Sequence, residues 1–300
     1  MYRSTILHRT LRIMAIAAVV ATISSNAVFA SVEKDTIKRS FKVESGGTLY
    51  LDLDRGDVTV VAVRGDMVMV EMERLVNQSD SDDVKRVLAR HEWEIELDGD
   101  DVVIESRYQN ERNRRRRTEE FRLRVTVKVP LDYNVDFSTG AGTVDISDLS
   151  GYVDGETGAG NIRVGEIDGD VSVRAGSGNI HIQGVTGGLE VQSGAGNIDI
   201  GFVGGETEAT TGAGNIIARI VRQPEDDSRL ESGAGNVTVY LDGAIGLTVD
   251  AKSSVGSADC EFGLEVAGRW MSKSFSGRVN GGGPDLTLRS GVGNVSLLRL

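Results

Sequence analysis

Apolar residues in the second half of the chain recur at two positions that follow a repeated glycine-rich box. The box reads TGAGNI at residues 157–162, and its copies begin at residues 139, 157, 175, 193 and 211, a constant spacing of 18. Three further copies begin at residues 232, 253 and 290. After the glycines, two apolar columns flank a variable residue, as in Ile162, Arg163 and Val164. This alternation has the period of a β-strand with one buried face.

Each 18-residue unit contains another short strand, such as VSV at 171–173 or LEV at 189–191. Two or three short strands joined by glycine bends do not bury their inner face alone, whereas stacked units do. The repeat therefore predicts an all-β fold, a β-solenoid of about eight rungs over residues 135–300. A late insertion at about residues 262–284 precedes the final rung and is expected to help cover that end.

The position after the box glycines holds asparagine in most copies. Glycine permits a tight or left-handed corner, and asparagine is the commonest other residue in that conformation. Stacked in register, the amides are able to hydrogen-bond along the rod. We predict a structural turn ladder, and the sequence leaves open whether its side chains point inward or cap the bend. Its members are Asn161, Asn179, Asn197, Asn215, Asn236 and Asn294.

Residues 31–134 form a predicted N-terminal β-rich capping region with one helix. Segments 36–43, 48–54, 57–63 and 66–76 alternate as strands do, and Arg-Gly-Asp triplets at 55–57 and 64–66 have the composition of turns. The helix follows Ser and Asp residues near residue 80, with Val84, Val87 and Leu88 at helical spacing.

Three further strands are expected at residues 92–98, 101–108 and 121–129. The first carries acids and the third carries bases at alternate positions. If these two strands are neighbours, the charges pair on one sheet face. The residues concerned are Glu92, Glu94, Glu96, Arg122, Arg124 and Lys128.

Residues 1–30 have the order of a secretory signal: arginines, the apolar run IMAIAAVVATI and small residues up to Ala30. The run is too short to span a bilayer comfortably, so we expect an exported mature chain without a transmembrane anchor, periplasmic or at the cell surface or secreted. Removing three of 33 basic residues and none of 45 acids gives 30 minus 45, a charge of −15. Nucleic acid is therefore a poor partner.

The glycine boxes do not have the context of a ligand loop. No copy has the Walker spacing or opens a helix, which argues against a phosphate site. Calcium loops need a constant column of oxygen ligands, but the variable column holds residues as different as Asp145, Arg163 and Ile217. We therefore expect neither a metal nor a cofactor.

No catalytic residues are predicted, and the chain is interpreted as a non-enzyme. His91 and His181 have no recognisable partner for nucleophilic catalysis. Cys260 falls in an apolar column and is expected to be a small core residue. Carboxylates on one outer face keep a glycan-active enzyme open as an alternative, because polysaccharide lyases and hydrolases also use β-helices.

Four consecutive arginines interrupt the acidic composition between two predicted strands. The interpretation that assigns them no function is an exposed hairpin tip. The functional alternative is a contact with anionic envelope polymers or phospholipid, or a protease-sensitive loop. These residues are Arg114, Arg115, Arg116 and Arg117.

The repeated boxes, the segment TLYLDLDRGDVTV at 48–60 and the closing NGGGPDLTLRSGVGNVSL at 280–297 resemble the bacterial putative-adhesin family of exported β-strand repeat proteins, a domain of unknown function. The resemblance implies a β-solenoid without established catalytic residues. Ser254, Ser257 and Ala258 depart from the pattern, so the rung that contains them is expected to be distorted and near the cap.

The leading functional hypothesis is a non-enzymatic, exported cell-envelope β-solenoid with an adhesin-like binding or structural role. Its partner would be an envelope component, a glycan, a lipid headgroup or a protein. One alternative is the glycan-active enzyme on a β-helix scaffold. A second is an envelope-stress sensor or decoy, in which the acidic chain binds cationic peptides through salt-sensitive contacts.

Overall fold

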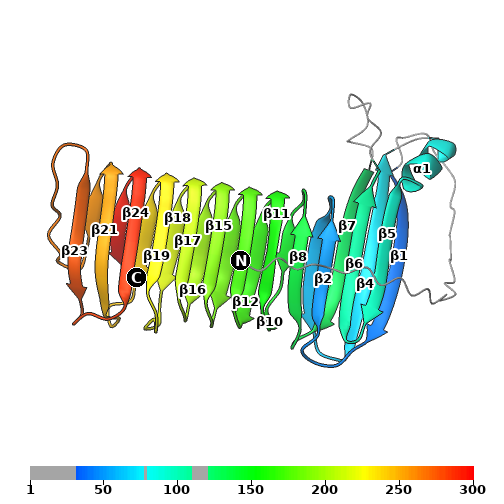
Figure 1. The fold of residues 1–300 in the computed structure, drawn as a ribbon, viewed down its shortest axis with the longest axis horizontal. Helices are drawn as coiled ribbons and strands as arrows, with labels where there is room; N and C mark the ends of the chain where they lie inside the picture. Colours follow the sequence, from blue (N-terminus) through cyan, green and yellow to red (C-terminus); the bar gives the residue numbers. More distant parts are fainter. Residues whose placement is uncertain (1–31, 78–79, 110–120) are drawn as a thin grey trace.

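The computed structural model describes residues 32–77, 80–109 and 121–300, in which two long sheets run side by side along an elongated rod (Figure 1). Sheet I has the order β1-β4-β7-β3-β9-β12-β14-β16-β18-β20-β25-β22, and sheet II the order β23-β21-β24-β19-β17-β15-β13-β11-β8-β2-β6-β5. Most neighbouring strands are parallel. The predicted all-β solenoid is confirmed.

Each box forms a corner between one strand of sheet II and one strand of sheet I. The strands before the corners are β8 (Asn134–Thr139), β11 (Val153–Ala159), β13 (Val171–Ser177), β15 (Leu189–Ala195), β17 (Thr207–Ala213) and β19 (Ser228–Ala234). Those after them are β9 (Val144–Ile146), β12 (Ile162–Asp168), β14 (Ile180–Val185), β16 (Ile198–Val203), β18 (Ile216–Ile220) and β20 (Val237–Leu241). The short β10 (Leu149–Ser150) also pairs with β12.

The repeat spacing is the pairing register. Ile162 pairs with Ile180, and Ile180 pairs with Ile198, so residues 18 apart lie one above the other. These isoleucines are fully buried between the sheets, as the two apolar columns predicted. A continuous apolar interior is the consequence, because every rung adds the same inward residues.

Both sheets continue into the N-terminal part of the chain. The pair β2 (Thr48–Leu53) and β3 (Asp57–Val63) stacks in parallel on β8 and β9, and β6 (Asp101–Tyr108) and β7 (Phe121–Pro130) stack on β2 and β3. The boundary predicted at residues 134–135 thus falls inside both sheets. The Arg-Gly-Asp triplet at 55–57 forms a solenoid corner, since Asp57 Oδ1 accepts a 3.0 Å hydrogen bond from the backbone N–H of Thr143.

Antiparallel strands and the helix cover the N-terminal end of the rod. In sheet I, β4 (Met67–Asn77) lies antiparallel to β7 and β1 (Val32–Lys42) antiparallel to β4, while β5 (His91–Asp98) ends sheet II beside β6. Helix α1 (Ser81–Leu88) links them; Asp80 caps its first turn, and its Val84 and Val87 are buried. The amphipathic helix therefore closes the apolar interior.

The condition for charge pairing between residues 92–98 and 121–129 is not met, because the two strands are not neighbours. They lie in different sheets: β7 pairs with β4 and β3, and among the described strands β5 pairs with β6 alone. Arg124 instead reaches Glu73 of β4 at 3.4 Å. Across from β5, Glu94 faces another acid, Glu105.

The last strands of the chain are not the last in space. After β21 (Leu247–Val255), β22 (Ala258–Cys260) and β23 (Lys273–Val279), the chain returns as β24 (Asp285–Val292) and β25 (Val295–Arg299). Strand β24 inserts between β19 and β21, and β25 between β20 and β22. The rung with Ser257 and Ala258 is therefore the terminal one, and its Cys260 is only half-buried against the core.

Candidate functional site

The asparagines of the boxes are joined by side-chain-to-backbone hydrogen bonds. The Oδ1 atom of Asn161 accepts from the backbone N–H of Asn179 at 2.9 Å, and the same bond joins each asparagine to the next. At the C-terminal end Asn294 serves the N–H of Ser257. Most of these side chains are exposed at the bend, so they cap the corner rather than point inward. The ladder therefore holds neighbouring rungs in register.

We expect Asn197→Ala to lower the free energy of unfolding by about 1 kcal/mol, because the N–H of Asn215 loses its acceptor at an exposed corner. Chemical denaturation measures this change. Thr210→Ala, at a half-exposed position on the neighbouring β17, is the control and should leave stability nearly unaltered. Equal stabilities for the two variants would show that the ladder does not stabilise the stack.

The arginine run Arg114–Arg117 lies outside the described residues, between β6 and β7. Its contact with anionic envelope material stays a prediction.

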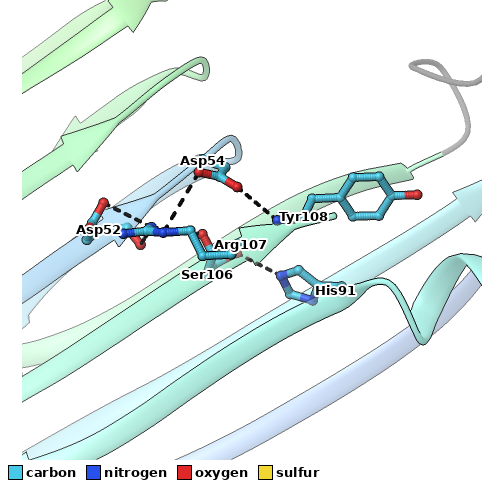
Figure 2. Close-up of polar contacts among 6 residues, drawn as sticks. All are labelled: Asp52, Asp54, His91, Ser106, Arg107 and Tyr108. Atoms are coloured by element: carbon cyan, nitrogen blue, oxygen red, sulfur yellow. Dashed lines mark hydrogen bonds and ion pairs between the residues drawn. The ribbon is translucent and has the colours of Figure 1, made fainter. Parts of the chain in front are cut away.

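A buried histidine–serine pair lies where β5 meets β6 (Figure 2). His91 Nε2 is 2.7 Å from Ser106 Oγ, and the ring packs against Phe121 with centroids 5.0 Å apart. His91 Nδ1 has no hydrogen-bond partner within the described part of the chain. The sequence did not indicate this partner for His91. Ser106 is distant from it along the chain, and the antiparallel pairing of β5 with β6 brings the two residues together.

The environment keeps this imidazole neutral. Burial, assisted by the Arg74 cation, lowers the His91 pKa from 6.5 to about 4, while Asp54 opposes the shift. A histidine beside a serine is the arrangement that activates a nucleophile. Here the serine is 2% exposed and the histidine 5% exposed, and no carboxylate of the described residues hydrogen-bonds Nδ1. The pair is closed to a substrate in this structure, which favours a packing role.

Charged residues lie on the other face of the same strand (Figure 2). Arg107 forms ion pairs with Asp52 and, at 3.9 Å, with Asp54, whose other oxygen accepts the N–H of Tyr108 at 2.9 Å. Hydrogen bonding to Asp52 raises the Arg107 pKa above its usual value. These contacts tie β2 to β6, so they stabilise the stack at its N-terminal end.

A surface groove crosses sheet I where β10, β12, β14 and β16 end. It has a volume of about 240 Å³, and Leu131, Leu149, Ile167 and Phe202 are among the residues that line it. Leu149 and Ile167 are buried in the core, so the exposed Leu131 and the half-buried Phe202 offer the accessible apolar side chains. Gly184 makes room for the Phe202 ring. Glu166, Gly184 and Phe202 are successive neighbours across the strands, and a Cβ on Gly184 would overlap with that ring.

Three carboxylates border this acidic groove. Asp148 accepts the backbone N–H of Glu166 at 2.8 Å, Glu166 accepts from Gln183 at 3.2 Å, and Asp168 accepts from Thr186 at 2.8 Å. Within the described residues none of the three forms an ion pair with Lys or Arg, and they do not gather closely enough to be a metal site. Apolar lining beside unneutralised carboxylates suits a ligand with cationic groups and an apolar body.

The family model described as Toastrack DUF4097 matches residues 51–297. The chain belongs to this family. The match extends over strands on both sides of residue 135, which agrees with the continuity of the two sheets, and it confirms the family resemblance predicted from the glycine boxes. No curated relative matches the chain.

Solved structures similar to this Toastrack chain share little sequence with it. A putative cell adhesion protein from Clostridium sporogenes is 13% identical with a TM-score of 0.28, covering 89% of this chain and 100% of that one. A putative adhesin from Bacteroides fragilis is 12% identical with a TM-score of 0.34, covering 88% and 97%. A putative lipid binding protein from Parabacteroides distasonis is 12% identical with a TM-score of 0.40, covering 87% and 96%. Scores this low say nothing about the ligand of this chain.

The sequence of this Toastrack chain did not identify the residues of the acidic groove in advance. The three acids fall at variable positions, and Leu131 precedes the first glycine box altogether. The deviation from the repeat was Phe202, an aromatic ring in a position held by Glu166 and Gly184 in the preceding rungs. Among the described residues no helix has the length and apolar character needed to cross a bilayer.

Proposed function

We propose that the protein is a non-enzymatic binding rod of the cell envelope, exported after removal of residues 1–30, and that it holds its ligand in the acidic groove. The observation that carries this proposal is the combination of the apolar side chains of Leu131 and Phe202 with three carboxylates that form no ion pair with Lys or Arg in the described part of the chain. The carboxylates are those of Asp148, Glu166 and Asp168. The ligand class is a cationic amphipathic molecule such as a basic peptide. The closed His91–Ser106 pair favours binding over catalysis.

The solenoid suits this role because it is a stiff scaffold. Every described strand of the stack is hydrogen-bonded to its neighbours, and one apolar interior runs through it. A groove on packed strands keeps its shape without a ligand, so little ordering is needed on binding. The formal charge of −15 that remains after removal of residues 1–30 also favours encounter with cations at low ionic strength.

We expect the double variant Glu166→Gln/Asp168→Asn to weaken binding of a helical Lys/Leu peptide roughly tenfold at low salt, because two uncompensated charges are lost from the groove. Isothermal titration calorimetry at low and high salt measures this loss, which should shrink as salt screens the charges. The matched control Glu156→Gln/Glu208→Gln removes two exposed acids from the outer face of sheet II.

Equal weakening by both double variants would show that net charge rather than the groove binds the peptide. The same proteins are incubated with envelope polysaccharide to test the enzyme alternative. Turnover by the wild type that is lost in Glu166→Gln/Asp168→Asn would contradict the non-enzymatic proposal and favour the glycan-active enzyme.

A further inference from the structure

Exposed apolar side chains gather at the C-terminal end of the rod. Of the twelve large hydrophobic residues that are exposed within the described chain, five belong to this end. Val255 and Val292 pair across β21 and β24, and the N–H of Gly256 donates to the Met271 carbonyl at 2.9 Å, which brings the insertion loop beside them. We call this set the apolar tip: Val255, Val266, Trp270, Met271 and Val292. Strands β21 and β23, which flank the insertion loop, lie at the left of Figure 1.

The tip interrupts a regular column of small residues. Along the corner the exposed box residue is alanine or serine in five successive rungs: Ala159, Ser177, Ala195, Ala213 and Ala234. The last two rungs in space carry Val292 and Val255 instead, which are 57% and 39% exposed. The exposed corner therefore becomes more apolar toward this end. Apolar side chains on a solvated corner do not stabilise the fold, and a group of them is typical of an interaction site.

Trp270 is the most exposed of the group. It is 95% exposed and has a φ of 55°, a left-handed conformation that is unfavourable for a bulky side chain. The hydrogen bond from Gly256 to Met271 and a 3.3 Å bond from the N–H of Ser272 to the Arg269 carbonyl hold the loop in this shape. A strained backbone that presents an indole to solvent is typical of a binding loop rather than of a packing element.

Three cations lie close to the tip in sequence and pairing. Lys252, Arg269 and Lys273 lie on or beside the loop, and within the described residues their side chains form no ion pair. Asp250, the nearest acid on β21, is already paired with Arg289. Glu265 lies in the loop, and the exposed Asp259 and Glu261 lie on its β22 side. The tip thus combines a tryptophan, further apolar side chains and three cations that form no ion pair among the described residues. Tryptophan favours the interface between membrane and water, and basic side chains favour anionic headgroups.

We propose that the apolar tip docks on a bilayer that contains anionic phospholipid, with Trp270 and Met271 in the interfacial region and the three cations against phosphates. Docking at one end stands the rod on the membrane, and it leaves the acidic groove on the side of the rod. This contact goes beyond the proposed binding function and does not depend on it.

The two tryptophans allow a site-specific test in the full chain. Trp93→Phe leaves Trp270 as the sole indole, and Trp270→Phe leaves Trp93, which is half-buried under Arg39 at the opposite end. Vesicles of phosphatidylcholine with phosphatidylglycerol should shift the Trp270 emission to shorter wavelength and allow quenching by brominated acyl chains. The Trp93 emission should stay constant. Any lipid contact of residues 1–30 or Arg114–Arg117 is common to both variants.

A binding variant completes the experiment. Trp270→Asn should reduce co-sedimentation with these vesicles by about tenfold or more, because the interfacial side chain is lost. Asparagine tolerates a positive φ, so the thermal unfolding midpoint should not fall. Sedimentation of Trp93→Phe without a change in Trp270 emission would overturn the proposal and place the lipid contact elsewhere. A blue shift that grows with protein concentration in the absence of lipid would overturn it in favour of a second copy, and absence of binding would also overturn it.

Discussion

Gly178→Ala is expected to unfold the solenoid well below the unfolding temperature of the wild type. Gly178 has a φ of 136°, which side-chain-bearing residues rarely adopt, and a Cβ would overlap with the Gly160 carbonyl oxygen one rung below. Strain of the backbone and overpacking at a closed corner together cost about 3 to 5 kcal/mol. That is a large part of the stability of an ordinary domain. Thermal and chemical denaturation measure the loss.

The control for this substitution lies one rung later. Gly188→Ala places its Cβ 3.7 Å from Asp170 Oδ1, an ordinary contact, and the residue has no positive φ. Its effect should stay within about 1 kcal/mol. If both alanines are tolerated equally, the close approach of neighbouring corners is not what requires glycine in the box.

Acidification from about pH 7 to about pH 5 is expected to lower the free energy of unfolding by about 2 kcal/mol through His91 alone. The folded pKa is about 4 and the ordinary value is 6.5. At a pH below 6.5 and above about 4, His91 is protonated in the unfolded chain but neutral in the folded chain. Protonation therefore favours the unfolded chain, and the free energy of unfolding decreases as the pH is lowered. The loss is complete below the folded pKa. Urea denaturation across this range measures the slope.

His91→Gln isolates this contribution. The variant keeps a polar side chain beside Ser106 and removes the titrating group, while Glu73, Glu96 and Asp136 titrate as in the wild type. We expect the wild type to lose more stability than the variant over the same range. Parallel pH profiles for the two proteins would contradict a neutral buried imidazole.

The glycine boxes determine the part of the fold that was predicted well. Residues 18 apart stack directly, because inward apolar residues such as Ile180 must meet equivalent residues in adjacent rungs to leave water. Residues 48–63 were harder to place, because a single box-like corner at Gly56 provides no repeat to align. The charges on β5 and β7 misled for a related reason: alternation identifies the exposed face of a strand but not its neighbour.

The candidate sites depended on contacts that periodicity does not encode. Leu131 lines the groove although it lies outside the repeats. The ring of Phe202 lies over Gly184 on the adjacent strand, where the missing Cβ leaves space for it. Trp270 was visible in the sequence as part of an insertion, but an inserted tryptophan packs on the core as often as it projects from it. Its exposure follows from the loop bonds to Gly256 and Ser272.

By itself the sequence determined the all-β class, the register of 18, the corner asparagines and the family, since these follow from a pattern that repeats locally. Only the tertiary structure decided that β24 and β25 insert before β21 and β22, that His91 meets Ser106, and that the groove and the apolar tip exist. The physical reason is that backbone hydrogen bonds form between any two parallel strands, whatever their side chains, so the pattern within a strand does not specify its partner. Which strands become neighbours is therefore settled by the packing of the whole chain.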